Sequence, residues 1–410
     1  MTKKIKIMKT KLWEKEFKTD KLIEQFTIGK DRTMDLFIAP YDVIASKAHA
    51  KMLCKVGLIT KNESEQLLEG LNEIEELIKE GKFAINEGIE DIHTQIEFYL
   101  TVRYGETGKK IHTARSRNDQ VLTAIKLYLK TELQVIKSKS TDLQKLFNEL
   151  ASKHKGIVLP GYTHFQVAMP SSFEMWFTAY AESLADDLEL VNAAYNVCNK
   201  NPMGSAAGYG TNFNIDKEFT TQEMGFDSFH KSDVYAQMTR GKSEKITAMA
   251  ISSIAHTLSK FSYDVCLYMC QNFNFISFPE QFTTGSSIMP HKKNPDVFEL
   301  IRAKCNVLQG LPNQLTLLIN NLPSGYHRDM QLTKEIIFPA IEQLKECLNV
   351  LLHVLPSIHI NAHCADNELY KHMYSVNEVN QLVMQGIPFR EAYGIVSKKI
   401  QEEARSTSFQ

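Results

Sequence analysis

A short segment at residues 284–295 combines polar groups that could act on an anionic substrate. It reads Thr-Gly-Ser-Ser-Ile-Met-Pro-His-Lys-Lys-Asn-Pro, and apolar residues recur at helical spacing directly after it. Pro295 and Asp296 stand where the start of a helix favours them. The N–H groups of that helix start, with Lys292 and Asn294 just ahead of them, predict a site for an anion. A solvated basic loop is the open alternative.

Two further polar stretches stand at expected helix ends. Residues 112–120 read His-Thr-Ala-Arg-Ser-Arg-Asn-Asp-Gln, ahead of an amphipathic segment that runs from Val121 to about Lys153. They could hold an anion or only cap a helix, and the residues alone leave both readings open. Residues 160–166 predict a turn that carries His164. Its place on a loop favours acid–base work, although a structural hydrogen-bonding role is the alternative.

Other kinds of site find no support in the sequence. The Gly-rich residues 202–211 lack the Gly-Lys-Ser/Thr ending of a phosphate-binding loop, so they predict close backbone approach to a ligand or to a packed helix. His359 and His363 are four residues apart, but no carboxylate or cysteine pair completes a metal-ligand set. We therefore expect no metal and no cofactor. The three polar stretches together suit acid–base chemistry on a substrate with several carboxylates.

The composition bounds the class of protein and its surroundings. The chain has 410 residues, and its net charge of −1 argues against nucleic acid as a partner. Its 7 cysteines are scattered without the spacing of a disulfide framework, which favours a reducing, cytoplasmic compartment. The lysine-rich start is not followed by the apolar run of a secretory signal. We also expect no membrane partner, because no apolar run is long enough to span a bilayer.

Nearly every long element is predicted to be helical. The expected helices cover about 42–53, 62–80, 92–104, 121–153, 171–199, 232–271 with a break at Gly241, 296 onward with an interruption at Pro312, and a last long one ending near 355. Thr60 with Glu63 three residues later predicts a capping box at the start of the second helix, and the third begins after Glu90 and Asp91. Helices of this length predict an all-α fold built around a long helix bundle. We divide the chain into an N-terminal helical domain at 1–111, a central bundle at 112–357 and a small helical domain at 358–410.

Several motifs then indicate a family. Residues 285–295 resemble the signature of the fumarase/aspartase superfamily, whose members eliminate fumarate from succinyl compounds. Residues 91–94, 112–120, 161–166 and 295–302 resemble the argininosuccinate lyase branch in particular. The resemblance extends over roughly residues 11 to 400. Such a set of dispersed motifs is far more specific than any one of them.

The resemblance implies a cofactor-free elimination and a role for each catalytic residue. Ser286 is the expected base, and Lys292 favours its ionised form because a neutral serine is too weak a base. Lys292 and Asn294 are expected to stabilise the charge that develops on the substrate carboxylate. His164, oriented by Glu299, is expected to serve the leaving side or to shuttle protons.

The resemblance also implies the residues that hold the substrate and the way the subunits assemble. The substrate is expected to be argininosuccinate, split to L-arginine and fumarate. Three mostly helical domains are expected, with a twenty-helix core in a homotetramer and each active site drawn from three subunits. The loop at 284–295 is expected to close over the substrate. The implied substrate-binding residues are Ser116, Arg117, Asn118, Thr163, Asn294, Tyr326, Gln331, Lys334 and Arg240.

The chain departs from the family pattern in four places. Residues 13–17 read Trp-Glu-Lys-Glu-Phe instead of the usual Trp-Gly-Gly-Arg-Phe, and a serine common in relatives is replaced within residues 29–32. Gly241 stands where an aspartate is common, and the early end of the chain predicts a curtailed third domain. Adenylosuccinate lyase, aspartase and fumarase are the alternatives within the superfamily. A structural relative like the lens crystallins is the alternative outside enzymes.

Overall fold

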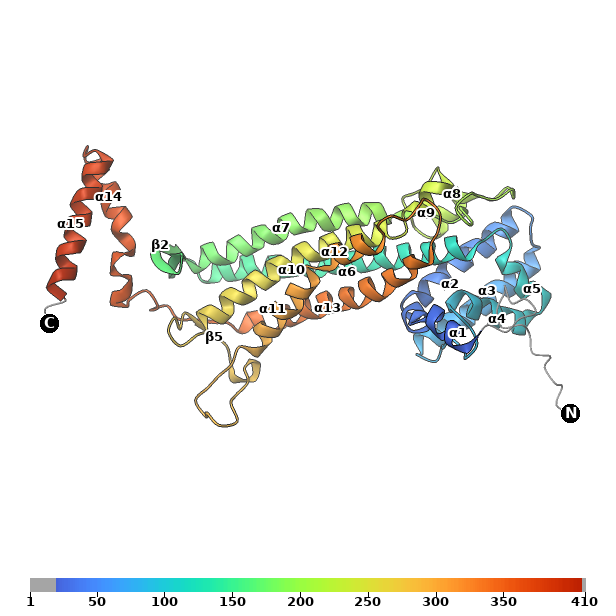
Figure 1. The fold of residues 1–410 in the computed structure, drawn as a ribbon, viewed down its shortest axis with the longest axis horizontal. Helices are drawn as coiled ribbons and strands as arrows, with labels where there is room; N and C mark the ends of the chain where they lie inside the picture. The colour runs from blue at the N-terminus through green and yellow to red at the C-terminus, as the bar shows by residue number, and fades with distance from the viewer. Residues whose placement is uncertain (1–19, 408–410) are drawn as a thin grey trace. The chain divides into compact units, whose positions relative to one another are not determined.

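The computed structural model describes residues 20–407, and the departure at residues 13–17 lies outside this range. The described chain is dominated by helices, which confirms the all-α prediction (Figure 1). The α-helices are α1 Lys21–Ile28, α2 Asp31–Lys55, α3 Lys61–Lys79, α4 Ile92–Tyr104, α5 Glu106–Lys109, α6 Arg117–Lys153, α7 Phe173–Cys198, α8 Lys217–Glu223, α9 Asp233–Met238, α10 Lys242–Tyr268, α11 Asp296–Leu308, α12 Leu311–Leu318, α13 Thr333–Val354, α14 Ser375–Met384 and α15 Phe389–Thr407.

The strands of the described residues are short and form three two-stranded sheets. Strands β1 Val158–Thr163 and β2 Gln166–Ser172 make an antiparallel hairpin, whereas β3 Lys200–Asn201 and β4 Ser228–Phe229 are parallel. Strands β5 Ile276–Ser277 and β6 His359–Ile360 pair antiparallel. The hairpin was not predicted, because its Pro-Gly-rich first strand reads as a turn.

The chain divides into two compact units. Unit 1 contains Met1–Ser138, Asp187–Ala255 and Val307–Lys345, and unit 2 contains Lys139–Asp186, His256–Asn306 and Glu346–Gln410. Helices α6, α7, α10 and α13 each contribute residues to both units. The division into domains at 1–111, 112–357 and 358–410 stays a prediction.

Helix starts near the N-terminus follow their sequence signals. Thr60 and Glu63 form the predicted capping box: Glu63 N donates to Thr60 Oγ1 at 3.3 Å, and Thr60 N donates to the Glu63 carboxylate at 2.9 Å. Asp91 caps α4 by accepting Thr94 N at 2.8 Å. The predicted start of α2 at residue 42 was wrong, because the helix begins at Asp31 and continues through Pro40. Burial of apolar residues on both sides of this proline offsets the hydrogen bond that it removes.

The predicted break at Gly241 is confirmed between α9 and α10. Gly241 has φ +78°, a left-handed conformation that glycine adopts without the steric cost of a side chain. A Cβ at this position would also stand 2.8 Å from the Cγ2 atom of Ile319. The departure from the family's aspartate therefore fits the local packing of this chain.

Unit 2 has a core rich in aromatic side chains. Trp176 stacks on Phe261 with ring centroids 5.3 Å apart, and Phe147 meets Phe261 edge-on at 4.9 Å. The Asp264 carboxylate accepts hydrogen bonds from Trp176 Nε1 at 3.1 Å and from the Tyr180 hydroxyl at 2.6 Å. These bonds satisfy the polar ends of the two large rings, so helices α7 and α10 can bury them.

Candidate functional site

The loop at residues 284–295 is closed at its base by backbone pairing. Thr284 and Asn294 form an antiparallel bridge, with Asn294 N donating to Thr284 O at 2.8 Å. The side chain of Asn294 donates to Gly285 O at 3.4 Å, and the Thr284 hydroxyl donates to the carboxylate of Asp296. Helix α11 follows directly from Asp296, as predicted. The two ends of the loop therefore lie next to each other, beside the start of α11.

Ser286 lies half-buried inside this loop, and its hydroxyl oxygen already accepts hydrogen bonds. Ile288 N and Met289 N donate to Ser286 Oγ at 3.4 and 3.2 Å. Donors aimed at an oxygen stabilise its ionised form, which is the form that a serine base requires. Lys292 is exposed, and it forms no ion pair within the described residues. The loop thus presents an oxygen base and a lysine from one short segment.

The β1–β2 hairpin carries Thr163 and His164 in a strained turn. Thr163 pairs with Gln166, so His164 and Phe165 are the two residues of the loop, and their φ angles are +53° and +56°. Two positive φ values match a type I′ turn, which normally selects Asn and Gly. A side chain in this conformation costs about 1–2 kcal/mol per residue. Both residues are exposed, so the fold holds the imidazole out from the hairpin at an energetic cost.

Gly161 allows the two strands of this hairpin to approach closely. A Cβ at position 161 would lie 2.6 Å from Met169 O, and the strand register shifts between Pro160 and Tyr162. This close approach gives the Pro-Gly pair a structural purpose beyond the turn that the sequence predicted. The hairpin also packs against the 3-10 helix at Glu368–Tyr374, where the hydroxyls of Tyr162 and Tyr370 lie 3.2 Å apart.

In unit 1, the polar stretch before α6 is held by the buried Asp119. One carboxylate oxygen accepts Ser116 N at 2.9 Å, and the other accepts Gly204 N and Ala206 N, both at 3.0 Å. Asn118 N donates to the Ser116 hydroxyl at 3.2 Å. Burial raises the pKa of Asp119 to about 6, although these N–H groups oppose that shift. The Gly-rich stretch therefore packs against a helix start, which is one of its two predicted roles.

Arg117 points to an acidic pair that precedes α4. Its two terminal nitrogens donate to the Glu90 carboxylate at 3.2 and 3.3 Å, and its Nε lies 3.1 Å from Asp91 Oδ2. Burial alone lowers the pKa of Arg117, but the charges of Asp91 and Glu90 outweigh burial and raise it. The guanidinium is therefore charged and fixed in orientation.

Residues of the connector after α12 lie in the same unit and meet the buried Arg240. The guanidinium carbon of Arg240 is 5.7 Å from the centre of the Tyr326 ring, and Arg240 Nη2 donates to Met330 O at 3.4 Å. Gln331 donates both N–H groups of its side chain to the end of α1, at Thr27 O and Ile28 O. These three predicted binding residues are thus ordered by unit 1 itself.

Lys334 is buried, with only 3% of its side chain exposed, and it is paired with two carboxylates of α2. Its Nζ lies 2.7 Å from Asp31 Oδ1 and 2.5 Å from Asp35 Oδ1. Burial alone would lower the pKa of Lys334, but Asp35 and Asp31 raise it. The departure at residues 29–32 lies beside this cluster, because Lys30 pairs with Glu335 at 3.3 Å.

The predicted residues fall into two groups by unit. Unit 1 brings together residues before α6, in α9–α10 and in the connector before α13, and unit 2 contains the hairpin and the loop at 284–295. Glu299 is exposed on α11 and lies 4.0 Å from Arg302. No hydrogen bond joins it to His164 within the described residues, so its orienting role stays a prediction. The unit 1 members are Ser116, Arg117, Asn118, Arg240, Tyr326, Gln331 and Lys334; those of unit 2 are Thr163, His164, Ser286, Lys292, Asn294 and Glu299.

The acidic partners of these cations were missed from the sequence. Glu90 and Asp91 were interpreted as the residues ahead of a helix, and Asp91 also as part of a family motif. Asp31 was noted only within the departure at residues 29–32, and Asp35 was not singled out. The available signal was an acidic excess, since residues 31–91 contain 13 aspartates and glutamates against 7 lysines and arginines. A buried cation such as Lys334 requires such partners, and the half-buried Arg117 gains from them.

A buried histidine–aspartate pair between the first turn of α4 and helix α2 makes the stability of the fold depend on pH. His93 Nδ1 lies 3.0 Å from Asp42 Oδ1, and both side chains are buried. Burial alone lowers the pKa of His93, but the negative charge of Asp42 outweighs it and raises the pKa. The charged pair therefore stabilises the fold below pH 6.5, and this contribution is lost as the pH rises through the folded-state pKa. The urea midpoint of the wild type should therefore fall as the pH rises from 6 to 9. We expect this fall to be smaller in His93→Gln.

The matched control for this variant is His363→Gln. His363 lies 3.0 Å from Asp366, the same separation as the buried pair, but both of these side chains are exposed. Solvent screens this second pair, so its removal should leave the pH dependence unchanged. Equal pH profiles for wild type and His93→Gln would contradict the assigned coupling.

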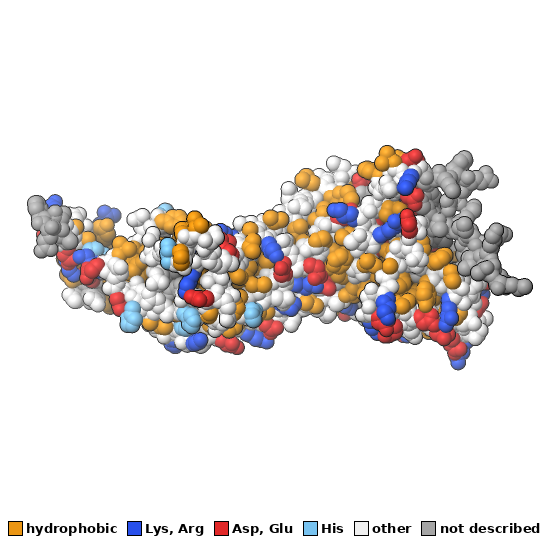
Figure 2. Space-filling model, turned by 90° about the horizontal axis from the view of Figure 1, so that it is seen from below, with side chains coloured by type: hydrophobic (Ala, Val, Ile, Leu, Met, Phe, Trp, Pro, Cys, Tyr) orange, Lys and Arg blue, Asp and Glu red, His pale blue; other side chains and the backbone are white. Residues whose placement is uncertain are grey.

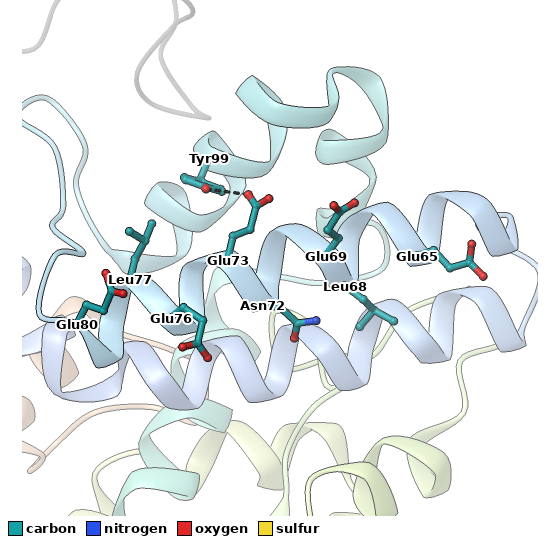
Figure 3. Close-up of a pocket in the computed structure, with 9 residues that line it drawn as sticks. All are labelled: Glu65, Leu68, Glu69, Asn72, Glu73, Glu76, Leu77, Glu80 and Tyr99. Carbon is teal, nitrogen blue, oxygen red and sulfur yellow. Dashed lines mark hydrogen bonds between the residues drawn. The ribbon is translucent and has the colours of Figure 1, made fainter.

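The hollow shown in Figure 3 contains none of the predicted site residues. It lies along the exposed face of α3, where Glu65, Glu69, Glu76 and Glu80 project with Leu68 and Asn72. Glu73 accepts the Tyr99 hydroxyl at 2.9 Å and pairs with Arg103 at 3.0 Å. An acidic surface of this kind repels a polycarboxylate, so it is not a candidate for the substrate.

Residues 20–407 lack two further features. No group of three or more His, Cys, Asp or Glu side chains there is arranged to hold a metal ion. Nor is any helix of this part of the chain long and apolar enough to cross a membrane. On the face seen in Figure 2, acidic and basic side chains are interspersed among hydrophobic ones.

Comparison with known proteins places the chain in a family. Residues 8–310 match the family described as lyase, and this match defines the class. The argininosuccinate lyase of Parabacteroides distasonis is 53% identical over 96% of this chain and 88% of the relative. That of Thermotoga neapolitana is 40% identical over 97% of this chain and 100% of the relative. The chain belongs to the argininosuccinate lyase family, a group of carbon–nitrogen lyases, which confirms the resemblance seen in the motifs.

A solved structure supports the fold. The crystal structure of EDDS lyase in complex with formate superposes with a TM-score of 0.82 and 23% sequence identity. The match covers 94% of this chain and 76% of that chain. At this identity the likeness concerns the fold alone, and it agrees with the helical architecture described above.

Proposed function

We propose that the chain eliminates fumarate from argininosuccinate and releases L-arginine, as a step in arginine biosynthesis. The observation that carries this proposal is the 53% identity to an argininosuccinate lyase across nearly the whole chain. The site geometry agrees with it, since one loop offers an oxygen base and a lysine while unit 1 offers fixed cations and amides. Such groups suit a substrate with several carboxylates and one guanidino group.

Ser286 is the base in the proposed mechanism. Its alkoxide removes the proton from the carbon next to a carboxylate of the succinyl group, and the electron pair spreads into that carboxylate. The N–H groups of Ile288 and Met289 support the alkoxide before the reaction. Lys292 and Asn294 stabilise the second negative charge on the carboxylate as it develops. The electron pair then returns to form the carbon–carbon double bond of fumarate, and the carbon–nitrogen bond breaks.

His164 serves the leaving side in this mechanism, where the departing guanidino nitrogen must gain a proton. The strained turn holds its imidazole away from the hairpin, where it can exchange protons with bound substrate. Glu299 orients it in the proposed assembly. Thr163 is the last residue of β1, directly before His164, and binds a substrate carboxylate.

The remaining predicted residues hold the substrate. Ser116, Arg117 and Asn118 stand at the start of α6, where N–H groups and the helix dipole favour a carboxylate. Tyr326 and Gln331 from the connector after α12, Lys334 from the start of α13, and Arg240 from between α9 and α10 complete the set in unit 1. These contacts are made without any metal or cofactor in the proposed reaction.

We infer that the active sites form in a homotetramer in the cytoplasm, each from three subunits. Long helices expose large apolar side chains that a partner subunit could cover: Met175 is 61% exposed, Leu300 61% and Val307 64%. No disulfide joins any of the 7 cysteines within the described residues, which suits a reducing compartment. The interspersed surface charge gives no support for a nucleic-acid partner.

One assay tests the proposed reaction. We expect fumarate absorbance to rise when argininosuccinate is supplied, with arginine formed in equal amount. Adenylosuccinate, aspartate and malate, supplied separately, should give no comparable signal. Activity on only one of these three would contradict the proposed substrate. Inactivity on all four would favour a structural role like that of the crystallins.

A further inference from the structure

We propose that Arg328 and Glu90 are positioning residues that orient Gln331 and Arg117 toward the substrate. This inference rests on the proposed function. Arg328 begins the 3-10 helix at Arg328–Leu332, and Glu90 precedes α4, so the pair joins two segments that are far apart in the sequence. Arg328 Nη2 lies 2.6 Å from Glu90 Oε1. The two residues carry no role in the reaction proposed above.

Arg328 determines which way the Gln331 side chain faces. Its Nε donates to Gln331 Oε1 at 3.1 Å, while Gln331 Nε2 donates to Thr27 O at 3.0 Å and to Ile28 O at 3.1 Å. Since two backbone carbonyls can only accept, the nitrogen of the amide must face them. Both N–H groups of Gln331 are therefore occupied. Only its carbonyl oxygen has capacity left, so it can receive an N–H group of the substrate.

Glu90 is shared between the two arginines. One carboxylate holds Arg117 by two hydrogen bonds at 3.2 and 3.3 Å and holds Arg328 at 2.6 Å, although only 5% of its side chain is exposed. Burial alone raises the pKa of Glu90, but hydrogen bonds from Arg117 and Arg328 outweigh it and lower the pKa. Glu90 is thus an anion between two cations.

An anion in this position cannot bind a carboxylate of the substrate, so its effect must pass through the arginines. Arg328 also donates from Nη2 to Thr27 O at 2.7 Å, which ties the end of α1 to the connector. Three of the five N–H donors of this guanidinium are therefore used on Thr27, Glu90 and Gln331. A lysine could not reproduce this planar fork. These contacts fix the orientations of the Arg117 and Gln331 side chains before the substrate binds, which lowers the entropy cost of binding.

The test measures fumarate release from argininosuccinate by Glu90→Gln, Arg328→Met and the double variant. A charge-assisted hydrogen bond contributes enough that we expect KM to rise about 10- to 100-fold in each single variant. We expect kcat to stay within about threefold, because Ser286 keeps its own contacts. KM of the double variant should be no higher than that of the single variant with the higher KM, since both changes break the same network.

The matched control is Glu73→Gln, at a glutamate drawn in Figure 3. Glu73 is also paired with an arginine, since Arg103 lies 3.0 Å from its carboxylate. This substitution should leave KM and kcat unchanged. A merely structural role for the Glu90 pair would lower kcat through loss of folded enzyme at constant KM, and that result would overturn the inference. Additive effects in the double variant would overturn it too. A wild type that does not cleave argininosuccinate would instead refute the proposed function.

Discussion

Replacing Ser286 with alanine is expected to lower kcat by about 10²- to 10⁴-fold, the usual contribution of a positioned base. The variant should keep its helical content and its oligomeric state. The physical reason is that the proton next to a carboxylate is very weakly acidic, and the loop offers Ser286 Oγ as the oxygen base already surrounded by N–H donors. The measurement is the rate of fumarate formation at saturating argininosuccinate.

The folded state should tolerate this change because the lost hydrogen bonds are local. Among the residues that the structure describes, Ser286 Oγ accepts only from Ile288 N and Met289 N of its own loop, and neutral hydrogen bonds of this kind contribute about 1 kcal/mol each. The pairing between Thr284 and Asn294 at the base of the loop does not use the Ser286 side chain. A large loss of activity without a change in the circular dichroism spectrum would therefore show that the substitution affects the catalytic step and not the fold.

Ser287→Ala is the matched control for this prediction. Ser287 is the exposed neighbour of Ser286 in the same loop, so the substitution removes the same atoms from the same backbone. We expect it to keep most of the activity. Near wild-type turnover in Ser286→Ala would remove this serine from the role of base. Equal losses in both variants would show that the loop as a whole, and not one hydroxyl, had been disturbed.

The sequence predicted the fold well where the signal is local. The Thr60–Glu63 capping box, the Asp91 cap and the break at Gly241 each depend on residues within a few positions of one another, and the structure has all three. The hairpin at 158–172 was missed because its first strand contains a Pro-Gly pair and its two-residue loop carries His-Phe instead of the usual Asn-Gly. The start of α2 was missed because Pro40 reads as a helix boundary unless burial on both sides is known.

The candidate site was predictable only in part, for a related reason. Motif resemblance supplied the residues that carry chemistry, such as Ser286 and His164, because each stands in a short recognisable segment. It did not supply the partners that set their orientation and charge. Glu90 reaches Arg328 across 238 positions of sequence, and Asp35 reaches Lys334 across 299. No local pattern encodes such pairs, which only folding brings together.

Replacing Lys334 with methionine is expected to destabilise unit 1 by about 3–5 kcal/mol, the usual cost of removing one partner from a buried ion pair. Lys334 is one of the predicted substrate-binding residues, yet two of its three N–H donors face Asp31 and Asp35 in this chain. Its removal would leave two carboxylates buried beside each other without their ion-pair partner. We expect a lower urea midpoint at pH 7 as well as weaker substrate binding.

The pH dependence of this loss separates electrostatics from packing. Burial raises the pKa of Asp31 from 3.8 to about 6, even though Lys334 opposes the shift. Without the lysine, the folded state takes up a proton at still higher pH, while the unfolded state does not. A raised folded-state pKa makes the fold more stable as the pH falls through it. The deficit of Lys334→Met should therefore shrink between pH 7 and pH 5.

Lys345→Met on the same helix is the control, because Lys345 also contacts two carboxylates, Glu132 and Glu342, each at 2.7 Å. Its side chain is 17% exposed against 3% for Lys334, so solvent reduces the cost of losing it. A double variant, Lys334→Met with Asp35→Asn, should recover part of the stability without recovering substrate affinity. If it recovered neither, the buried charges would not be the cause. If Lys334→Met left the urea midpoint unchanged, the Lys334 ammonium would contribute to substrate binding and not to the stability of the fold.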